Sequence, residues 1–262
     1  MNHVKRFNTY KKDSVWWMID PEFEEALQQV GLGSLSQAKD WIKKGDPSNL
    51  SSTRLEPGRG VSQIIPIPGR SESLHLRRML HGGLLAPLWR GHLAGVGRVR
   101  RELEVNSRLR QAGAPVPQPV FGMALRSGAL WKACFATIYL PETQNANQWL
   151  SDGALENDKR RVGIRAIATS IAAFHAYGGK HPDLNAGNIL VDKGGSELSA
   201  WIIDLDKVRV GTPSHPKRHR ELKRLIRSIQ KEGNPTLLTP LTQREFIETY
   251  EDSFQKKRNE SL

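Results

Sequence analysis

The chain has 262 residues, of which 38% are hydrophobic and 25% charged, with a formal net charge of +12 and a pI near 10.0. This composition is typical of a folded globular protein and argues against an intrinsically disordered chain. The sequence has no run of about eighteen apolar residues and no apolar segment behind its basic N-terminus, so we expect neither a transmembrane helix nor a secretory signal, and a cytoplasmic location. The positive charge favours an anionic partner: nucleic acid, an anionic lipid surface or a phosphorylated small molecule.

The cysteine and histidine content argues against a soft-metal site. Cys134 is the single cysteine and lies between apolar residues, so we expect it in a buried strand, without an intramolecular disulfide. We interpret four histidines as lacking metal-site spacing to cysteine or to one another: His81, His175, His215 and His219. Of these, His175 is expected to be packed or hydrogen-bonded on a long helix.

The N-terminal third predicts two helices followed by two strands. A short amphipathic helix is expected between Pro21, which suits a first helical turn, and Gly31, which suits a helix end. A second helix is expected to open at Ser36. Turn-forming residues follow, and residues 57–80 predict two strands joined by a turn at Pro68.

The middle of the chain predicts one helix and one strand with a connector between them. Residues 98–113 have apolar side chains at helical spacing and end in glycine, which predicts a helix. Residues 114–122 are rich in proline and are expected to form an extended connector. This connector leads into a strand over 129–140.

Beyond a crossover near residue 141, the chain predicts mainly helix. The elements expected here are a short helix over 145–150, a long amphipathic helix over 160–178, strands over 187–192 and 200–206, and a basic helix over 217–228. The basic clusters in this helix and in residues 98–110 could equally be solvated helix faces.

The stretch HPDLNAGNILVD, residues 181–192, carries the pattern H-x-D-x-x-x-x-N followed by a strand. A second carboxylate, Asp204, ends the next strand. Phosphoryl transfer needs a base near the acceptor hydroxyl and oxygen ligands for magnesium. Asn188 and Asp204 can share a hard cation through oxygen, and Asp183 is left to orient and deprotonate a hydroxyl.

Several stretches together resemble one family. The catalytic stretch with IIDLDK, the later RHRELKRLIRSI, and the earlier LHLRRMLHGGLL and RLRQAGAPVPQPV are similar to lipopolysaccharide core kinases of the 3-deoxy-D-manno-octulosonic acid (Kdo) kinase type. The resemblance covers roughly residues 55–250. It implies an α+β, protein-kinase-like fold of two lobes. These are expected to be an N-terminal extension over 1–54 packing on the N-lobe, a small antiparallel-sheet N-lobe with one helix over 55–141, and a mainly helical C-lobe over 142–262.

The resemblance also implies roles for individual residues. Asp183 would be the catalytic base, supported by His181 through hydrogen bonding, and Asn188 and Asp204 would be magnesium ligands. Asp206 is expected to be either a further metal contact or a hydrogen-bond anchor for its loop. The phosphate-covering turn of the ATP site would contain two glycines, Gly58 and Gly60.

One departure from the protein-kinase pattern concerns the cation that holds the nucleotide phosphates. Residues 45–131 contain no lysine, and Arg77 stands where a lysine would be expected. A guanidinium can bind phosphate with two hydrogen bonds. Arg78 would face the opposite side of the strand and is the register alternative; either arginine could also be a plain surface charge. The expected acidic partner is Glu102, with Glu104 as the second choice.

The sequence thus predicts an ATP- and Mg²⁺-dependent sugar kinase that phosphorylates Kdo in the lipopolysaccharide inner core. Its partners would be ATP and an anionic Kdo–lipid A precursor, met by peripheral association with the cytosolic face of the inner membrane. One alternative keeps the fold and changes the acceptor to a core heptose, another small hydroxylated molecule or a protein. The other is a non-catalytic basic module that binds membrane or nucleic acid, although no nucleic acid is expected for the kinase.

Overall fold

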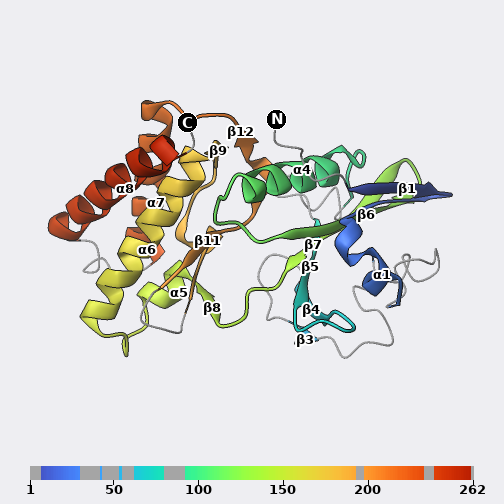
Figure 1. Cartoon of the computed structure of the whole chain (residues 1–262), viewed down its shortest axis with the longest axis horizontal. Coiled ribbons are helices and arrows are strands. Elements are labelled where there is room, and N and C mark those ends of the chain that lie inside the picture. The colour runs from blue at the N-terminus through green and yellow to red at the C-terminus, as the bar shows by residue number, and fades with distance from the viewer. Residues whose placement is uncertain are drawn as a thin grey trace. The chain divides into compact units, whose positions relative to one another are not determined.

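The computed structural model describes residues 7–29, 42, 53–54, 62–79, 92–192, 198–232 and 239–260 (Figure 1). The chain divides into two compact units: residues 1–107 with 118–140, and residues 108–117 with 141–262. The division of the chain into three parts made from the sequence stays a prediction. Within the described residues, no helix is long and apolar enough to cross a membrane.

The first unit is built on one antiparallel sheet of seven strands, in the order β1-β2-β6-β7-β5-β4-β3. Its strands are β1 (Asn8–Lys12), β2 (Val15–Ile19), β3 (Thr53–Arg54), β4 (Ser62–Pro66), β5 (Ser73–Met79), β6 (Pro119–Ser127) and β7 (Leu130–Ile138), and its helices are α1 (Pro21–Gln29) and most of α4 (Gly97–Gln111). The predicted helices at 21–31 and 98–113 are confirmed, as are the two strands within 57–80 and the strand over 129–140.

The sheet of the first unit has a hydrophobic cluster on each face. Side chains alternate along β2, so Trp16 and Met18 join the cluster under α4, while Val15 and Ile19 join the cluster that includes α1. The two helices therefore cover opposite faces of the sheet (Figure 1). Cys134 is buried in β7, as predicted.

The connector predicted over 114–122 is wrong in its second half, because β6 begins at Pro119. Proline has no N–H to donate, but it is tolerated as the first residue of a strand. Gly122 lies within β6, where a Cβ would come within 2.4 Å of a Val99 methyl and 2.8 Å of a Leu103 methyl. The glycine thus lets α4 approach the sheet closely.

The second unit is mainly helical. Its helices are α5 (Ala146–Leu150), α6 (Asn157–Ala176), α7 (His215–Glu232) and α8 (Pro240–Glu260), with the 3₁₀ turns η1 (Ala186–Asn188) and η2 (Leu205–Lys207). Its strands are β8 (Thr143–Asn145), β9 (Gly179–Lys180), β10 (Ile189–Asp192), β11 (Ala200–Ile202) and β12 (Arg209–Val210), paired as β11-β10-β8 and β12-β9. The predicted helices over 145–150, 160–178 and 217–228 are confirmed. The strands predicted over 187–192 and 200–206 are confirmed at 189–192 and 200–202, whereas 187–188 and 205–206 belong to the 3₁₀ turns η1 and η2.

Helix α6 is the central element of the second unit. Its predicted apolar stripe is buried and consists of Ile164, Ile167, Ile171 and Phe174. Gly163 allows Trp149 of α5 to pack on the helix backbone, since a Cβ there would lie 2.0 Å from the indole ring. Helix α8 packs along α6, as Figure 1 shows, with Tyr250 and Phe254 fully buried. The C-terminal end of α6 also contacts the loop before β10, where the ring centroids of Phe174 and His181 lie 6.3 Å apart.

Candidate active site

The loop between β9 and β10 carries the predicted catalytic pattern. The Asn185 side chain accepts a hydrogen bond from the Gly187 N–H at 3.0 Å and so caps the 3₁₀ turn η1. Asn185 Nδ2 and Asn188 Nδ2 both donate to the backbone carbonyl of Asp183, at 2.9 and 3.0 Å. The Asp183 carboxylate is exposed. The loop backbone is therefore fixed by two amides, while the side chain of Asp183 is presented to solvent.

Antiparallel pairing brings Asn188 and Asp204 to the same end of two strands. Ile189 of β10 pairs with Ile202 of β11, and the Ile203 N–H donates to the Asn188 carbonyl at 3.0 Å. Asp204 follows at once and adopts the left-handed backbone conformation, with φ 59° and ψ 59°. A non-glycine residue in this region is uncommon and is found preferentially at functional sites. The amide oxygen of Asn188 and the carboxylate of Asp204 are the hard oxygen donors that suit Mg²⁺.

His181 connects the catalytic loop to the strand that ends at Asp204. Its Nδ1 accepts from the Asp183 N–H at 3.3 Å, and its Nε2 lies 3.2 Å from the Ile203 carbonyl. An N–H can only donate and a carbonyl can only accept, so the ring is the neutral tautomer with its hydrogen on Nε2. Burial lowers the pKa of His181, which favours this neutral form. The ring thereby links the backbone N–H of Asp183 to the backbone carbonyl of Ile203, the residue before Asp204.

Helix α7 holds the same loop from a second side. Three side chains of this helix form hydrogen bonds with backbone atoms of the loop. The Glu221 carboxylate accepts from the His181 N–H at 2.9 Å, Arg224 donates to the Pro182 carbonyl, and Ser228 Oγ accepts from the Ala186 N–H at 3.0 Å. Residues 221, 224 and 228 are three and four positions apart, so they lie on one face of the helix.

A buried hydrogen-bond chain extends from Glu221 into the core. His175 Nε2 lies 3.0 Å from Glu221 Oε2, and His175 Nδ1 lies 2.7 Å from the Tyr250 hydroxyl. His175 and Tyr250 have no exposed surface, and burial raises the pKa of Tyr250. A carboxylate only accepts, so His175 Nε2 carries a hydrogen toward Glu221. The expectation that His175 is hydrogen-bonded is confirmed, and the chain links α6, α7 and α8 to the catalytic loop.

The first unit contains the ion pair that was predicted from the sequence. Arg77 of β5 forms an ion pair with Glu102 of α4. Glu102 is 1% exposed and Arg77 is 24% exposed, with the guanidinium 5.4 Å from the Phe135 ring centroid. Arg78 donates instead to the Ile42 carbonyl at 2.6 Å. The second-choice acid, Glu104, pairs with Arg100 on the surface of α4 at 2.8 Å.

Three further residues were predicted to belong to the site: Gly58, Gly60 and Asp206. Gly58 and Gly60 lie outside the described residues. Asp206 is half-buried within η2, directly after the turn at Asp204. Its two predicted roles, metal contact and loop anchor, both stay open.

Comparison with known proteins identifies the family. Residues 66–250 match the model of the "Lipopolysaccharide kinase (Kdo/WaaP) family". The chain belongs to this family. A 3-deoxy-D-manno-octulosonic acid kinase of Xanthomonas oryzae pv. oryzae is 33% identical over 233 residues, covering 82% of this chain and 88% of the relative. One of Stenotrophomonas maltophilia is 36% identical over 213 residues, covering 79% of this chain and 78% of the relative.

A solved structure, "WaaP in complex with acyl carrier protein", matches the present chain with a TM-score of 0.53. The match covers 85% of this chain and 94% of that chain at 16% identity, and it supports the fold. The predicted family, the α+β protein-kinase-like fold and the phosphotransferase class are thus confirmed.

Sequence reasoning missed the contacts made by α7. Glu221, Arg224 and Ser228 stood within a segment interpreted only as a basic helix. Their spacing on one helix face was visible, but the acid among basic residues was not singled out. The interpretation that His215 and His219 lack metal-site spacing to one another is wrong, because they are four positions apart on α7, which places the two imidazoles on one helix face.

Proposed function

We propose that this protein transfers the γ-phosphoryl group of ATP to a hydroxyl of Kdo in the inner core of lipopolysaccharide. The main support is the arrangement of three residues of the second unit: Asn188 and Asp204 lie at adjoining strand ends, and Asn188 holds the backbone of the loop that carries Asp183. The identity of the relatives, which are named Kdo kinases, supports the acceptor. In this reaction the acceptor oxygen bonds to the γ-phosphorus, the bond from that phosphorus to the β–γ bridging oxygen breaks, and ADP leaves.

Asp183 is proposed to take the proton of the acceptor hydroxyl. Its exposed carboxylate can meet a substrate, while its backbone is held by Asn185, Asn188 and His181. Fixing the base in this way reduces the reorganisation needed to reach the transition state. His181 is a positioning residue, because its ring bonds to backbone atoms of the site.

Asn188 and Asp204 are proposed to hold magnesium, with Asp206 as a further contact or an anchor. An amide oxygen and a carboxylate oxygen at adjoining strand ends fit this hard cation. When bound, Mg²⁺ neutralises charge on the nucleotide phosphates. Asn188 has its Nδ2 engaged with the Asp183 carbonyl, which orients the amide so that its oxygen is the atom offered to the ion.

Arg77 is proposed to bind the nucleotide phosphates. Its ion pair with buried Glu102 fixes the guanidinium, and guanidinium groups match phosphate oxygens with two parallel hydrogen bonds. Gly58 and Gly60 remain the proposed phosphate-covering turn. The three-part organisation over 1–54, 55–141 and 142–262 is proposed alongside these roles.

The acceptor test is phosphorylation of a lipid A precursor that carries Kdo. Purified full chain with Mg²⁺ and ATP is expected to add one phosphate to the Kdo residue, located by tandem mass spectrometry. Asp183→Ala should abolish the transfer without changing the circular dichroism spectrum. Asp158→Ala, an exposed acid in the first turn of α6, is the matched control. Phosphate found on a heptose or a protein would identify another acceptor, and activity retained in Asp183→Ala would refute the base.

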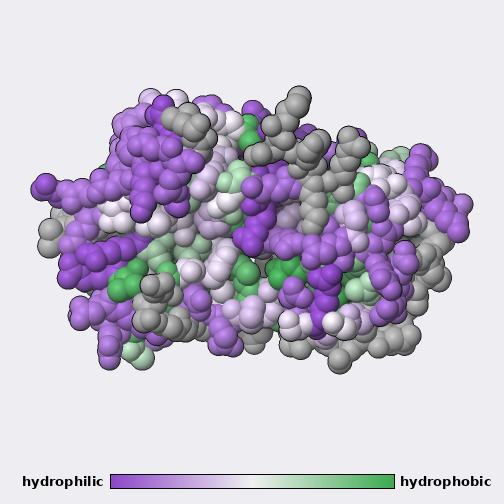
Figure 2. Space-filling view, viewed as in Figure 1, coloured by the Kyte–Doolittle hydropathy of each residue, from purple (hydrophilic) through white to green (hydrophobic). Residues whose placement is uncertain are grey.

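Peripheral membrane association is proposed from the charge of α7. Six basic side chains of this helix are exposed: Lys217, Arg220, Lys223, Arg224, Arg227 and Lys231. Glu221, the acidic residue of α7 whose side chain is described, is buried. On the face shown in Figure 2, hydrophilic residues prevail and hydrophobic residues form only small patches among the described atoms. The attraction to an inner membrane surface or to an anionic acceptor would thus be electrostatic.

Vesicle sedimentation tests the membrane proposal. The wild-type chain should sediment with vesicles that contain phosphatidylglycerol and should stay in solution with pure phosphatidylcholine. The double variant Lys223→Glu and Arg227→Glu should no longer sediment with the phosphatidylglycerol vesicles. Arg165→Glu, on the exposed side of α6, should keep it. Equal sedimentation of all three proteins would refute the role of α7, and tight binding of RNA without ATP binding would favour the nucleic-acid module.

A further inference from the structure

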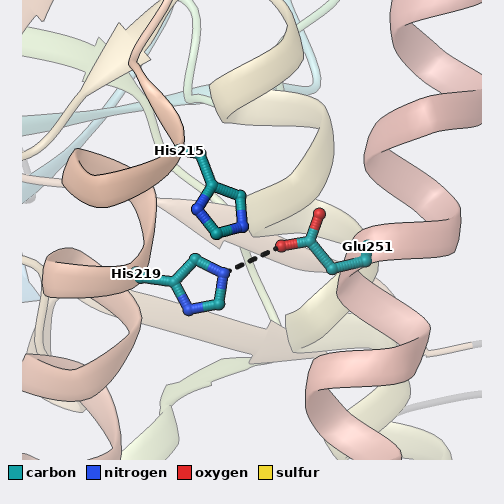
Figure 3. Close-up of side chains that lie close together, drawn as sticks. All are labelled: His215, His219 and Glu251. Carbon is teal, nitrogen blue, oxygen red and sulfur yellow. Dashed lines mark ion pairs between the residues drawn. The ribbon is translucent and has the colours of Figure 1, made fainter.

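Helices α7 and α8 bring together three side chains that can bind a metal ion and that do not belong to the catalytic loop. His215 opens α7, His219 follows one turn later, and Glu251 belongs to α8 (Figure 3). One nitrogen or oxygen from each lies within 4.8 Å of the other two. Among the residues that the structure describes, this is the one group of three or more histidine, cysteine or acidic side chains that meets this condition.

The two histidines are held side by side by the helix itself. Residues four apart on an α-helix lie on one face, and the ring centroids of His215 and His219 are 4.2 Å apart. This is the arrangement by which helices commonly offer two imidazoles to zinc. Glu251 faces the pair from α8, with its Oε1 at 3.3 Å from His219 Nε2.

Two of the candidate ligand atoms are shielded from water and form no regular hydrogen bond among the described residues. His219 Nε2 and Glu251 Oε1 have almost no accessible surface and no regular hydrogen-bond partner among the described residues. The side chains themselves remain about a third exposed, at 33% and 29%. A shielded polar atom without a hydrogen bond is unfavourable. A cation between these atoms would satisfy both, and the partial exposure gives an ion a way in.

The other oxygen of Glu251 is already oriented. Arg218 lies 3.3 Å from Glu251 Oε2 and rests its guanidinium on the Phe254 ring, 3.9 Å from the centroid. Such outer contacts hold ligating carboxylates in place. The arginine charge also disfavours any cation held by charge alone. Imidazole nitrogen as the majority ligand favours zinc and similar transition metals over Mg²⁺ or Ca²⁺.

We propose that His215, His219 and Glu251 form a binding site for one Zn²⁺ ion, distinct from the proposed magnesium ligands Asn188 and Asp204. Two imidazoles and one carboxylate form the three-ligand set of open zinc sites, with a further position for water. The ion would fasten the N-terminal end of α7 to α8. The next turns of α7 carry Glu221 and Arg224, so the site would secure the helix that holds the catalytic loop.

The test uses untagged full chain freed of metal with a chelator. Titration calorimetry with ZnCl₂ should show one saturable site, and Co²⁺ should give visible absorption of a low-coordinate cobalt site. Thermal unfolding should shift to higher temperature with Zn²⁺, because the ion binds the folded chain. MgCl₂ at the same concentration should cause neither effect at this site.

Variants separate this site from adventitious binding. His215→Ala, at an exposed position, and Glu251→Gln should each weaken Zn²⁺ binding at least tenfold and remove the cobalt absorption. His92→Ala, a histidine of the first unit, should bind as the wild type does. Absence of saturable binding, or equal affinity in His215→Ala and His92→Ala, would overturn the proposal. Because the readouts are metal binding and thermal stability, the result is independent of whether Kdo is the acceptor.

Discussion

The carboxylate of Glu221 accepts a hydrogen bond of 2.9 Å from the backbone N–H of His181. The residues are forty positions apart, and both are buried. The contact means that the catalytic loop depends on a helix that comes after it in the chain. Through His175 and Tyr250, the same carboxylate is connected to α6 and α8.

Replacing Glu221 should therefore impair catalysis through the loop. Glu221→Gln removes the charge and one of the two acceptor positions, so kcat should fall while the KM for ATP changes little. The free energy of unfolding should fall by about 1–3 kcal/mol, the cost of a broken buried hydrogen bond. Steady-state kinetics and urea unfolding measure the two effects.

The control for this change is Glu248→Gln. Glu248 forms an exposed i,i+4 pair with Arg244 on α8, so its loss should leave the free energy of unfolding close to the wild-type value. Equal kinetics in Glu221→Gln and the wild type would contradict a positioning role for Glu221.

Arg77 and Arg78 provide a matched pair for nucleotide binding. Arg77→Ala removes the cation that Glu102 holds, and the KM for ATP should rise by roughly 10–100-fold, as expected for a charged hydrogen bond. Arg78→Ala should leave this KM close to the wild-type value, because Arg78 binds the Ile42 carbonyl. If Arg78→Ala produces the larger effect, the other register of the strand supplies the phosphate ligand.

Gly122 should tolerate no side chain. The Cβ of Gly122→Ala would meet Val99 and Leu103 at distances far below van der Waals contact, so α4 must shift and the chain should lose about 1–3 kcal/mol. Gly153→Ala, where a Cβ would have nothing within 4 Å, is the control. Urea unfolding of both variants measures the difference, and equal stability would show that α4 can move at little cost.

The stability of the first unit should depend on pH through His75. Burial, with a smaller contribution from Arg77, lowers the pKa of His75 to about 4. The unfolded chain then binds more protons than the folded chain between about pH 6.5 and 4, so stability should fall as the pH falls through this window. Because the side chain is half-buried, the loss should be about 1–3 kcal/mol.

Comparison with His75→Gln isolates this contribution. The variant should show a flatter dependence of unfolding free energy on pH between 6.5 and 4, measured by denaturant titration at each pH. Identical slopes in the two proteins would place the acid sensitivity in other groups.

The elements with a strong local signal were predictable from sequence. The apolar stripe of α6 and the alternating pattern of β5 are each set by nearest neighbours along the chain. Strand β6 was missed because the prolines at 115, 117 and 119 suggested a connector. Strands β1 and β2 have a weak local signal, because β1 is polar and mostly exposed and β2 is apolar without alternation. The hydrogen bonds of Glu221 and the meeting of Glu251 with His219 depend on helices packing across the unit, which no local pattern encodes.

Helix α7 has an inner side that holds the catalytic loop and exposed basic residues that face solvent. Glu221 and Ser228, on its inner side, cannot change without disturbing the loop that carries Asp183. Among the exposed basic residues of α7, Arg224 also donates a hydrogen bond to the loop, at the Pro182 carbonyl. Substitutions among the outer basic residues other than Arg224 should therefore alter the attraction to an anionic surface or acceptor, while the loop that carries Asp183 keeps its hydrogen bonds to Glu221 and Ser228.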